Sequence, residues 1–166
     1  MKRLLTLLFL TLTLCVTVSA QNDIYKKCEK EKSVTTVYIS KTMLQMIGDG
    51  KAGNVDSGAM ALLKDKIDNV VIVNTDNAKG VKFLRDLRKN YMDNKNHEIL
   101  MQINDPNSDM VMFRIPLNGS KNEYAISVLG KDNAHMIVIE GNLTIEDIAR
   151  VTKGMGDKNG INIKKK

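Results

Sequence analysis

The chain has few of the residues from which catalytic, metal and disulfide sites are usually built. Its 166 residues include two cysteines, two histidines and no tryptophan, and aromatic residues make up 4%. The histidines, His97 and His135, each stand beside the start of a predicted strand and form no cluster of metal-ligand spacing. A nucleic-acid-binding protein would combine a concentrated basic stripe with aromatic stacking residues. The sequence has neither, so we expect no nucleic-acid partner.

The first twenty residues follow the order of a secretory signal peptide. Two basic residues follow Met1, an uncharged run extends from Leu4 to Val18, and small residues precede Gln21. This order is typical of a cleaved signal, and the run is shorter than the ~20 residues that span a bilayer. We therefore predict a signal peptide over residues 1–20 and export to the periplasm or cell envelope.

A lipid anchor at Cys15 is the alternative to cleavage before Gln21. Bacterial lipoproteins are cut immediately before a cysteine, and Leu12 to Cys15 puts one at about the right distance from the N-terminus. The residue before such a cut is normally small, whereas Leu14 is large. A lipid-anchored structural protein therefore stays as an alternative interpretation.

The formal net charge of +6 is concentrated at the two ends of the chain. Of the 25 basic residues, two lie in the predicted signal and three form the tail Lys164, Lys165 and Lys166, which leaves 20 against 19 acidic residues. We predict a nearly neutral single domain over residues 21–160 and a basic tail over residues 161–166. Weak attraction to anionic lipid is the expected property of the tail.

Cys28 is the only cysteine left once residues 1–20 are removed, so we expect no disulfide within the mature chain. The segment from Asp23 to Glu31 places Ile24 and Cys28 four residues apart, on the narrow apolar face of a short helix. A packed thiol is the simpler interpretation. An exposed, reactive thiol is the alternative.

Helices and strands are predicted to alternate in the first half of the mature chain. A β-rich run from Val34 to Ile39 passes without a loop into a Met-rich helical segment that Ser40 can cap. A glycine-rich stretch from Gly48 to Gly58 precedes another helix. The apolar face of that helix consists of Ala59, Leu62, Leu63 and Ile67. The run from Val70 to Val73 predicts a buried strand, and Asn77 to Tyr91 predicts an amphipathic helix.

From His97 onward the apolar residues alternate, which indicates strands. Four runs separated by short polar turns predict an antiparallel meander. The runs are Ile99–Ile103, Met110–Leu117, Tyr124–Leu129 and Met136–Ile139. A capping-box pattern from Thr144 to Asp147 then begins a closing helix. Its predicted buried residues are Ile145, Ile148, Thr152 and Met155. The predicted fold class is α+β, with two layers: one mostly antiparallel sheet of about six strands, and helices packed on one of its faces.

The glycine-rich stretch contains a literal G-x-G-x-x-G from Gly48 to Gly53, followed by a predicted strand and then Asp76. In a dinucleotide site such glycines let the backbone approach a pyrophosphate, and the acid binds the ribose. Here the residues before Gly48 have helical spacing, and the second half of the chain is a meander. A nucleotide-binding protein or enzyme is therefore the alternative, and a flexible connection is the simpler interpretation.

Asp105, Asn107 and Asp109 reproduce the first half of a calcium loop. That loop also needs a glycine at its sixth position and a glutamate at its twelfth, and here Met110 and Pro116 occupy those places. A hairpin turn accounts for the same polar residues. We predict no metal, no cofactor and no catalytic residues.

The chain contains ten methionines, several of them in the helical segment after the first predicted strand. Methionine suits adaptable apolar binding surfaces, and it also fills irregular gaps in cores. Tyr38, Met43 and Met46 are the candidate partner-binding residues on the first interpretation. Ordinary core packing is the simpler interpretation.

Two segments, Val34 to Leu44 (VTTVYISKTML) and Ile137 to Ile148 (IVIEGNLTIEDI), carry a family resemblance. The first resembles the N-terminal signature, and the second the closing strand and helix, of small exported bacterial proteins grouped as domain of unknown function 4252. The resemblance implies an envelope location and supplies no catalytic residues. Together with the predicted export and the neutral domain, it favours a non-enzymatic module that binds a protein, peptide or lipidic partner.

Overall fold

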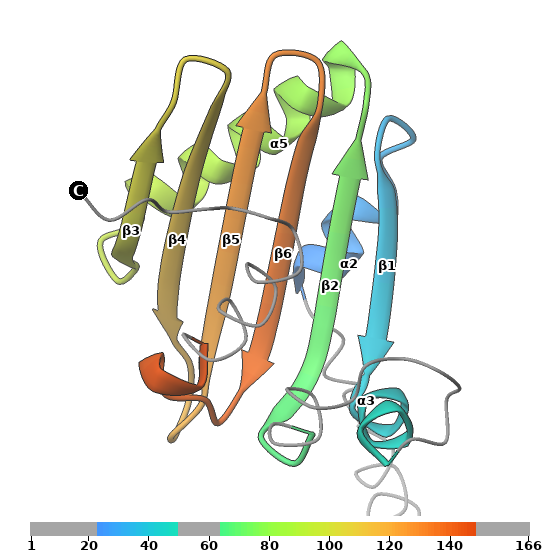
Figure 1. Ribbon diagram of the computed structural model, residues 1–166, viewed down its shortest axis with the longest axis vertical. Coiled ribbons are helices and arrows are strands. Elements are labelled where there is room, and N and C mark those ends of the chain that lie inside the picture. The colour runs from blue at the N-terminus through green and yellow to red at the C-terminus, as the bar shows by residue number, and fades with distance from the viewer. Residues whose placement is uncertain (1–22, 50–63, 149–166) are drawn as a thin grey trace, which may run out of the picture.

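The computed structural model describes residues 23–49 and 64–148, which form one six-stranded sheet with helices beside it (Figure 1). The spatial order of the strands is β1-β2-β6-β5-β4-β3, and all neighbouring strands are antiparallel. The strands are β1 (Thr35–Ser40), β2 (Ile67–Thr75), β3 (Glu98–Asn104), β4 (Ser108–Pro116), β5 (Asn122–Gly130) and β6 (Ala134–Gly141). The helices are α2 (Asp23–Cys28), α3 (Lys41–Gly48) and α5 (Ala78–Asp93). The α+β class, the antiparallel sheet and the four-stranded meander are confirmed.

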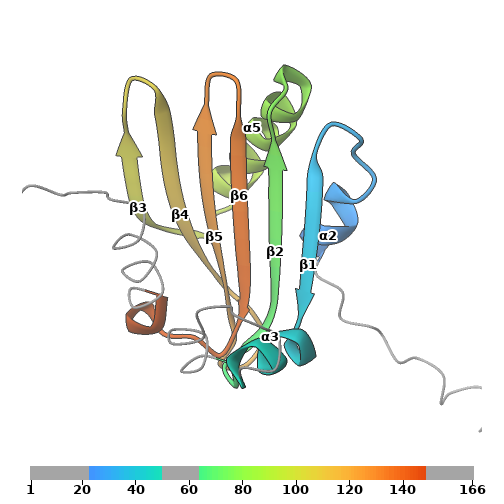
Figure 2. The same ribbon diagram turned by 45° about the vertical axis from the view of Figure 1, so that its right-hand side comes forward.

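Helices α2 and α5 cover one face of the sheet, behind the strands in Figures 1 and 2. We call this the helix face and the opposite side the open face. The inward residues predicted for α5 are all buried: Val81, Leu84, Leu87 and Tyr91. Phe113 of β4 is fully buried in the same cluster, with its ring 5.6 Å from that of Tyr91. This continuous apolar core fixes α5 on the sheet.

The start of α5 is tied to the loop before β1. Asn77 caps the helix by accepting a hydrogen bond from the Gly80 backbone at 2.9 Å, and its amide donates to the Ser33 carbonyl at 2.9 Å. The Thr75 hydroxyl donates to the same carbonyl. A Cβ at Gly80 would collide with Ser33 and Thr75. Glycine is therefore required for this close approach.

One end of the open face is covered by α3 and by the first turn of the closing helix, residues 145–148. Ser40 caps α3 as predicted, and Leu44 packs against the open-face ends of β2 and β6. The predicted capping box is also present: the Thr144 backbone donates to Asp147 at 3.1 Å, and the Asp147 backbone donates to Thr144 Oγ1 at 3.2 Å. Lys66 adds an ion pair to Asp147 at 2.8 Å.

Two predictions about individual residues are wrong. Ile67 was expected on the buried face of a helix, but it begins β2, because pairing with β6 overrides the local helical spacing. Ile145 was expected to be buried and is 46% exposed. The capping contacts turn Asp147 toward Lys66 and place Ile148 in the core, which leaves Ile145 at the surface. The other residues predicted for these helices, Ala59, Leu62, Leu63, Thr152 and Met155, lie outside the described residues.

Candidate functional site

The inner strands supply apolar side chains to both faces of the sheet. On β4, Val111 and Phe113 belong to the helix-face core, whereas Met112 belongs to the open-face cluster. On β6, Val138 faces the helices and Ile137 faces the open side. A sheet that is apolar on both faces is normally covered on both. The open face is therefore the candidate binding surface.

One apolar residue from each strand lines up across the open face. The strand register places Val37 opposite Ile72, Ile72 opposite Ile137, Ile137 opposite Ile126, Ile126 opposite Met112, and Met112 opposite Met101. We call these six residues the apolar row. With strands ~4.8 Å apart, the row extends about 24 Å from one edge of the sheet to the other.

The apolar row is exposed at its ends and half-buried along most of its length. Val37 is 43% exposed and Met101 38%, whereas Met112 is only 7% exposed. The three isoleucines are half-buried. No member of the row is charged, so a polar group placed against it would lose its hydration without gaining a hydrogen bond.

The surface beside the row is apolar on one half of the sheet and polar on the other. Ile103 of β3 lies opposite Met110 of β4, which lies opposite Val128 of β5. These three strands form the half of the sheet that ends at the β3 edge. At the same level on the other half, His135 Nδ1 is 2.9 Å from Asn74 Oδ1. The apolar surface is therefore widest toward β3.

On the β3 half of the sheet, polar side chains of β3, β4 and β5 border the other side of the row. Arg114 forms an ion pair with Glu98 at 2.6 Å, and the Tyr124 hydroxyl donates to the Leu143 carbonyl at 3.1 Å. Burial raises the pKa of Tyr124 above its usual value. These contacts leave the border with balanced charge and fix the side chains beside the row.

The structure separates the three candidate partner-binding residues. Met43 and Met46 are each 44% exposed on α3, at one end of the open face. Tyr38 points to the helix face, where its ring lies 5.2 Å from that of Tyr25. The sequence reasoning did not identify the apolar row. The signal was present in the unbroken apolar runs of β4 and β6, which predict strands covered on both faces.

Cys28 is packed in the helix-face core and is 1% exposed. Burial raises the pKa of its thiol to about 11, and nearby Lys27 opposes this effect weakly. A thiol with this pKa stays protonated at neutral pH and is a poor nucleophile. The geometry therefore favours the packed-thiol interpretation.

The two histidines lie apart in the structure. His97 precedes β3 and contacts the Tyr91 carbonyl at 3.1 Å, while His135 lies near the start of β6, at the opposite end of the sheet. Within residues 23–49 and 64–148, no three His, Cys, Asp or Glu side chains lie close enough to hold a metal ion. Tyr91 donates to Glu123 at 2.8 Å, and burial, together with this carboxylate, raises the pKa of Tyr91.

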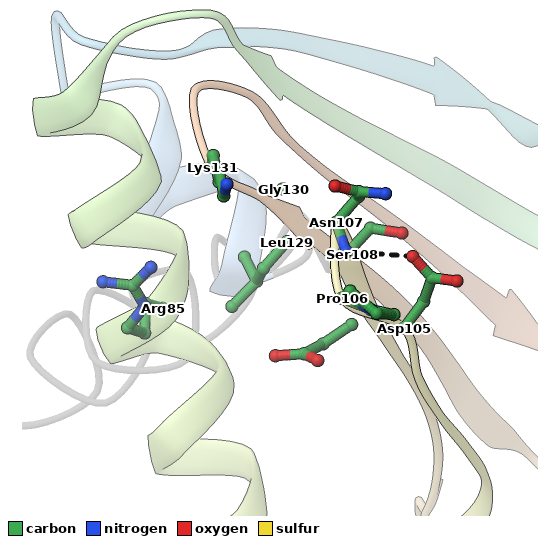
Figure 3. Close-up of a pocket in the computed structure, with 9 residues that line it drawn as sticks. Arg85, Asp105, Pro106, Asn107, Ser108, Leu129, Gly130 and Lys131 are labelled. Carbon is green, nitrogen blue, oxygen red and sulfur yellow. Dashed lines mark hydrogen bonds between the residues drawn. The ribbon is translucent and has the colours of Figure 1, made fainter.

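The calcium-like residues lie at the β3–β4 turn, beside a pocket of about 170 Å³ (Figure 3). Asp105 accepts a hydrogen bond from the Asn107 backbone at 2.9 Å, which is the turn contact drawn in the figure. Asp109 lies 3.6 Å from Arg88. Arg85 approaches from α5 on the other side of the pocket. The carboxylates thus stabilise a hairpin turn and pair with α5.

The glycine motif is preceded by a helix. Helix α3 leads into Gly48, and β1 and β2 are antiparallel neighbours, so the parallel βαβ unit of a dinucleotide site is not formed by these elements. Asp49 instead forms an ion pair with Lys64. Residues 50–53 of the motif lie outside the described residues.

The predicted signal peptide, Cys15 and the tail Lys164–Lys166 also lie outside the described residues. Among the helices that are described, none is long and apolar enough to cross a membrane. The export, anchoring and tail predictions therefore stay predictions.

Comparisons with known proteins place the chain in a family. A solved structure of a protein of unknown function from Pseudomonas aeruginosa matches with 5% sequence identity and a TM-score of 0.37, covering 82% of this chain and 86% of that one. No curated protein matches. The family model for domain of unknown function 4252 (DUF4252) matches residues 25–151, which include both segments that carry the resemblance. The chain therefore belongs to the DUF4252 family.

Proposed function

We propose that this protein is an exported, non-enzymatic envelope module that binds an amphipathic helix of a partner protein across its open face. The observation that carries the proposal is the uncharged apolar row, which crosses all six strands and is exposed at both ends. The predicted signal peptide supports the envelope location.

The dimensions of the row suit a helix. A width of about 24 Å equals the length of roughly 16 helical residues at 1.5 Å each. An amphipathic helix can place one apolar stripe along such a surface and keep its polar side in water. The methionines at and beside the row adapt to different side chains without a fixed pocket.

The expected affinity is modest. Removing a half-exposed aliphatic side chain from water contributes roughly 1 kcal/mol, and the row offers four or five such groups in addition to Ile103. Losing translational and rotational freedom costs at least ~4 kcal/mol. The apolar stripe of the helix buries a comparable area, which raises the favourable contribution to about 10 kcal/mol. After the association cost, the balance corresponds to a dissociation constant in the micromolar to millimolar range.

A defined peptide can test this surface. We would titrate the full chain with a fluorescent 16-residue Leu/Lys peptide of amphipathic helical pattern, and with a permuted peptide of identical composition, and record anisotropy. Val37→Glu and Met101→Glu should each weaken binding several-fold, because each places a charge against the apolar stripe. The matched control is Met92→Glu, since Met92 is 45% exposed on α5.

Other occupants of the row would give different results. Equal binding of the two peptides, or equal loss with the Met92 control, would contradict recognition of a helix at the row. Photo-crosslinkers placed at positions 37 and 101 provide an independent readout. Crosslinks only to the chain's own residues 50–63 or 149–166, or to vesicle lipid, would assign the surface to the chain itself or to lipid and would overturn the proposal.

A further inference from the structure

The two edges of the sheet differ in their protection. Strand β1 contacts both α2 and α3, and four of its six residues are partly buried. Strand β3 pairs with β4 on one side, and no described strand pairs with its outer edge. Six of the seven β3 residues are exposed. Among residues 23–49 and 64–148, the outer edge of β3 has no strand partner, and an edge of this kind can pair with a further strand.

Strand β3 lacks most of the features that discourage edge pairing. Its sequence, EILMQIN, contains no lysine and no proline, and its one charged residue, Glu98, stands at the end and pairs with Arg114. Ile99, Met101 and Ile103 are 45%, 38% and 47% exposed. A bulge between Ile99 and Met101 is the one protective feature present, and it leaves the stretch from Met101 to Asn104 regular.

We propose that β3 pairs with β3 of a second copy, antiparallel and centred on Gln102. This register is self-complementary, as a two-fold axis requires. Met101 of each protomer lies opposite Ile103 of the other, and both residues face the open side, since their β4 partners are Met112 and Met110. Gln102 lies opposite its own copy, where two side-chain amides can bond to each other.

The same register avoids repulsion and continues the apolar surface. In this register Asn104 faces the bulged residue Leu100, and Glu98 falls beyond the paired stretch, so no like charges oppose each other. The apolar row and the Ile103–Met110–Val128 surface continue from one protomer into the next. The inference concerns the sheet edge and does not depend on helix binding at the open face.

The expected dimer is weak. A single strand edge of seven residues buries much less than the ~1,600 Å² of a standard stable interface. Self-association should therefore be dependent on concentration and prominent only at high micromolar concentrations or above. An envelope protein held at a surface would reach such local concentrations more readily than one in dilute solution.

Analytical ultracentrifugation over a hundred-fold concentration range tests the proposal. The chain without residues 1–20 should shift reversibly from monomer to dimer. The double variant Met101→Lys, Ile103→Lys should raise the dissociation constant at least ten-fold, because charges on an edge strand oppose pairing. Val37→Lys on the β1 edge is the matched control and should leave the constant within two-fold. A wholly monomeric chain, or equal loss in the control, would overturn the inference.

Disulfide trapping reports the register without relying on those variants. Gln102→Cys should crosslink rapidly under mild oxidation, because the two copies lie directly opposite across the axis. Asn104→Cys should crosslink at least ten-fold more slowly, because its counterpart is Leu100 of the other copy. Equal rates, or faster crosslinking through Asn104→Cys, would contradict the Gln102-centred register.

Discussion

Met101 on the edge strand β3 lies directly opposite Met112 on β4, yet Met101 is 38% exposed and Met112 only 7%. The two methionines occupy the same level of the open face. Met101 has a neighbouring strand on one side only, whereas Met112 has one on each side. This pair marks where the apolar row reaches the edge of the sheet.

The Met101–Met112 pair gives a stability test of how the row is covered. Met112→Ala should lower the free energy of unfolding by about 2–3 kcal/mol, whereas Met101→Ala should cost less than ~1 kcal/mol, because less packing is lost at the exposed position. Urea titration of the full chain, with equal m-values, would measure both. An equal cost for the two variants would show that Met101 is covered in solution and would argue against the row as a contact surface.

Lys66 and Asp147 link the start of β2 to the closing helix, and this link should depend on pH. The Lys66 ammonium, followed by the Thr144 backbone, holds the pKa of Asp147 below its usual range. Because the folded pKa is lowered, the stabilisation is complete above the unfolded value of about 4 and is lost as pH falls through the folded pKa.

The matched variant for this link is Asp147→Asn. It should destabilise the chain by roughly 1 kcal/mol at pH 7, after allowance for the partly exposed Lys66. The difference from the parent chain should shrink as pH falls below about 4. Asp132→Asn, at the exposed β5–β6 turn, is the control. A difference independent of pH between 7 and 2.5 would refute the electrostatic account.

Cys28 should be unreactive in the folded chain. With a pKa of about 11, only about 0.1% of the thiol is ionised at pH 8, and the side chain is buried as well. In a Cys15→Ser chain, a thiol reagent such as Ellman's should react slowly without denaturant and completely within minutes in 6 M urea. Rapid stoichiometric reaction of the folded chain would show that α2 exposes the thiol.

Export can be checked on the N-terminus of the protein recovered from a bacterial envelope fraction. Cleavage by signal peptidase should leave Gln21 as the first residue, without lipid. Intact mass and N-terminal sequencing measure this directly, and a chain carrying Leu10→Arg, which interrupts the apolar run, is the matched control and should remain unprocessed. A mature chain that begins at an acylated Cys15 would establish the lipid-anchored alternative.

Much of the fold follows from local sequence patterns. The four strands of the meander, the caps at Ser40 and Thr144, and the inward residues of α5 were all predictable, because each depends on a spacing or a side chain that acts within one element. Ile67 was mispredicted because its strand assignment depends on pairing with β6, more than seventy residues away. Local spacing contains no information about that partner.

The candidate site was harder to predict than the fold. Tyr38, Met43 and Met46 are close in sequence, but Tyr38 belongs to the opposite face from the apolar row. Val37, Ile137 and Met101 are far apart in sequence, and only the strand order β1-β2-β6-β5-β4-β3 brings them to one level. The unbroken apolar runs of β4 and β6 indicated that both faces of the sheet are apolar. Which residues align across the open face depends on the strand register, which the local sequence does not contain.

The most direct test of the helix-binding surface is a methyl NMR titration of the full chain with the 16-residue amphipathic peptide. Methyl groups of Ile72, Ile126, Ile137 and Met112 should shift together in a saturable way. Methyl groups of Val71, Val73 and Val138, which lie in the helix-face core, should stay in place. Shifts confined to the helix-face residues, or no saturable shift in the row, would contradict the account.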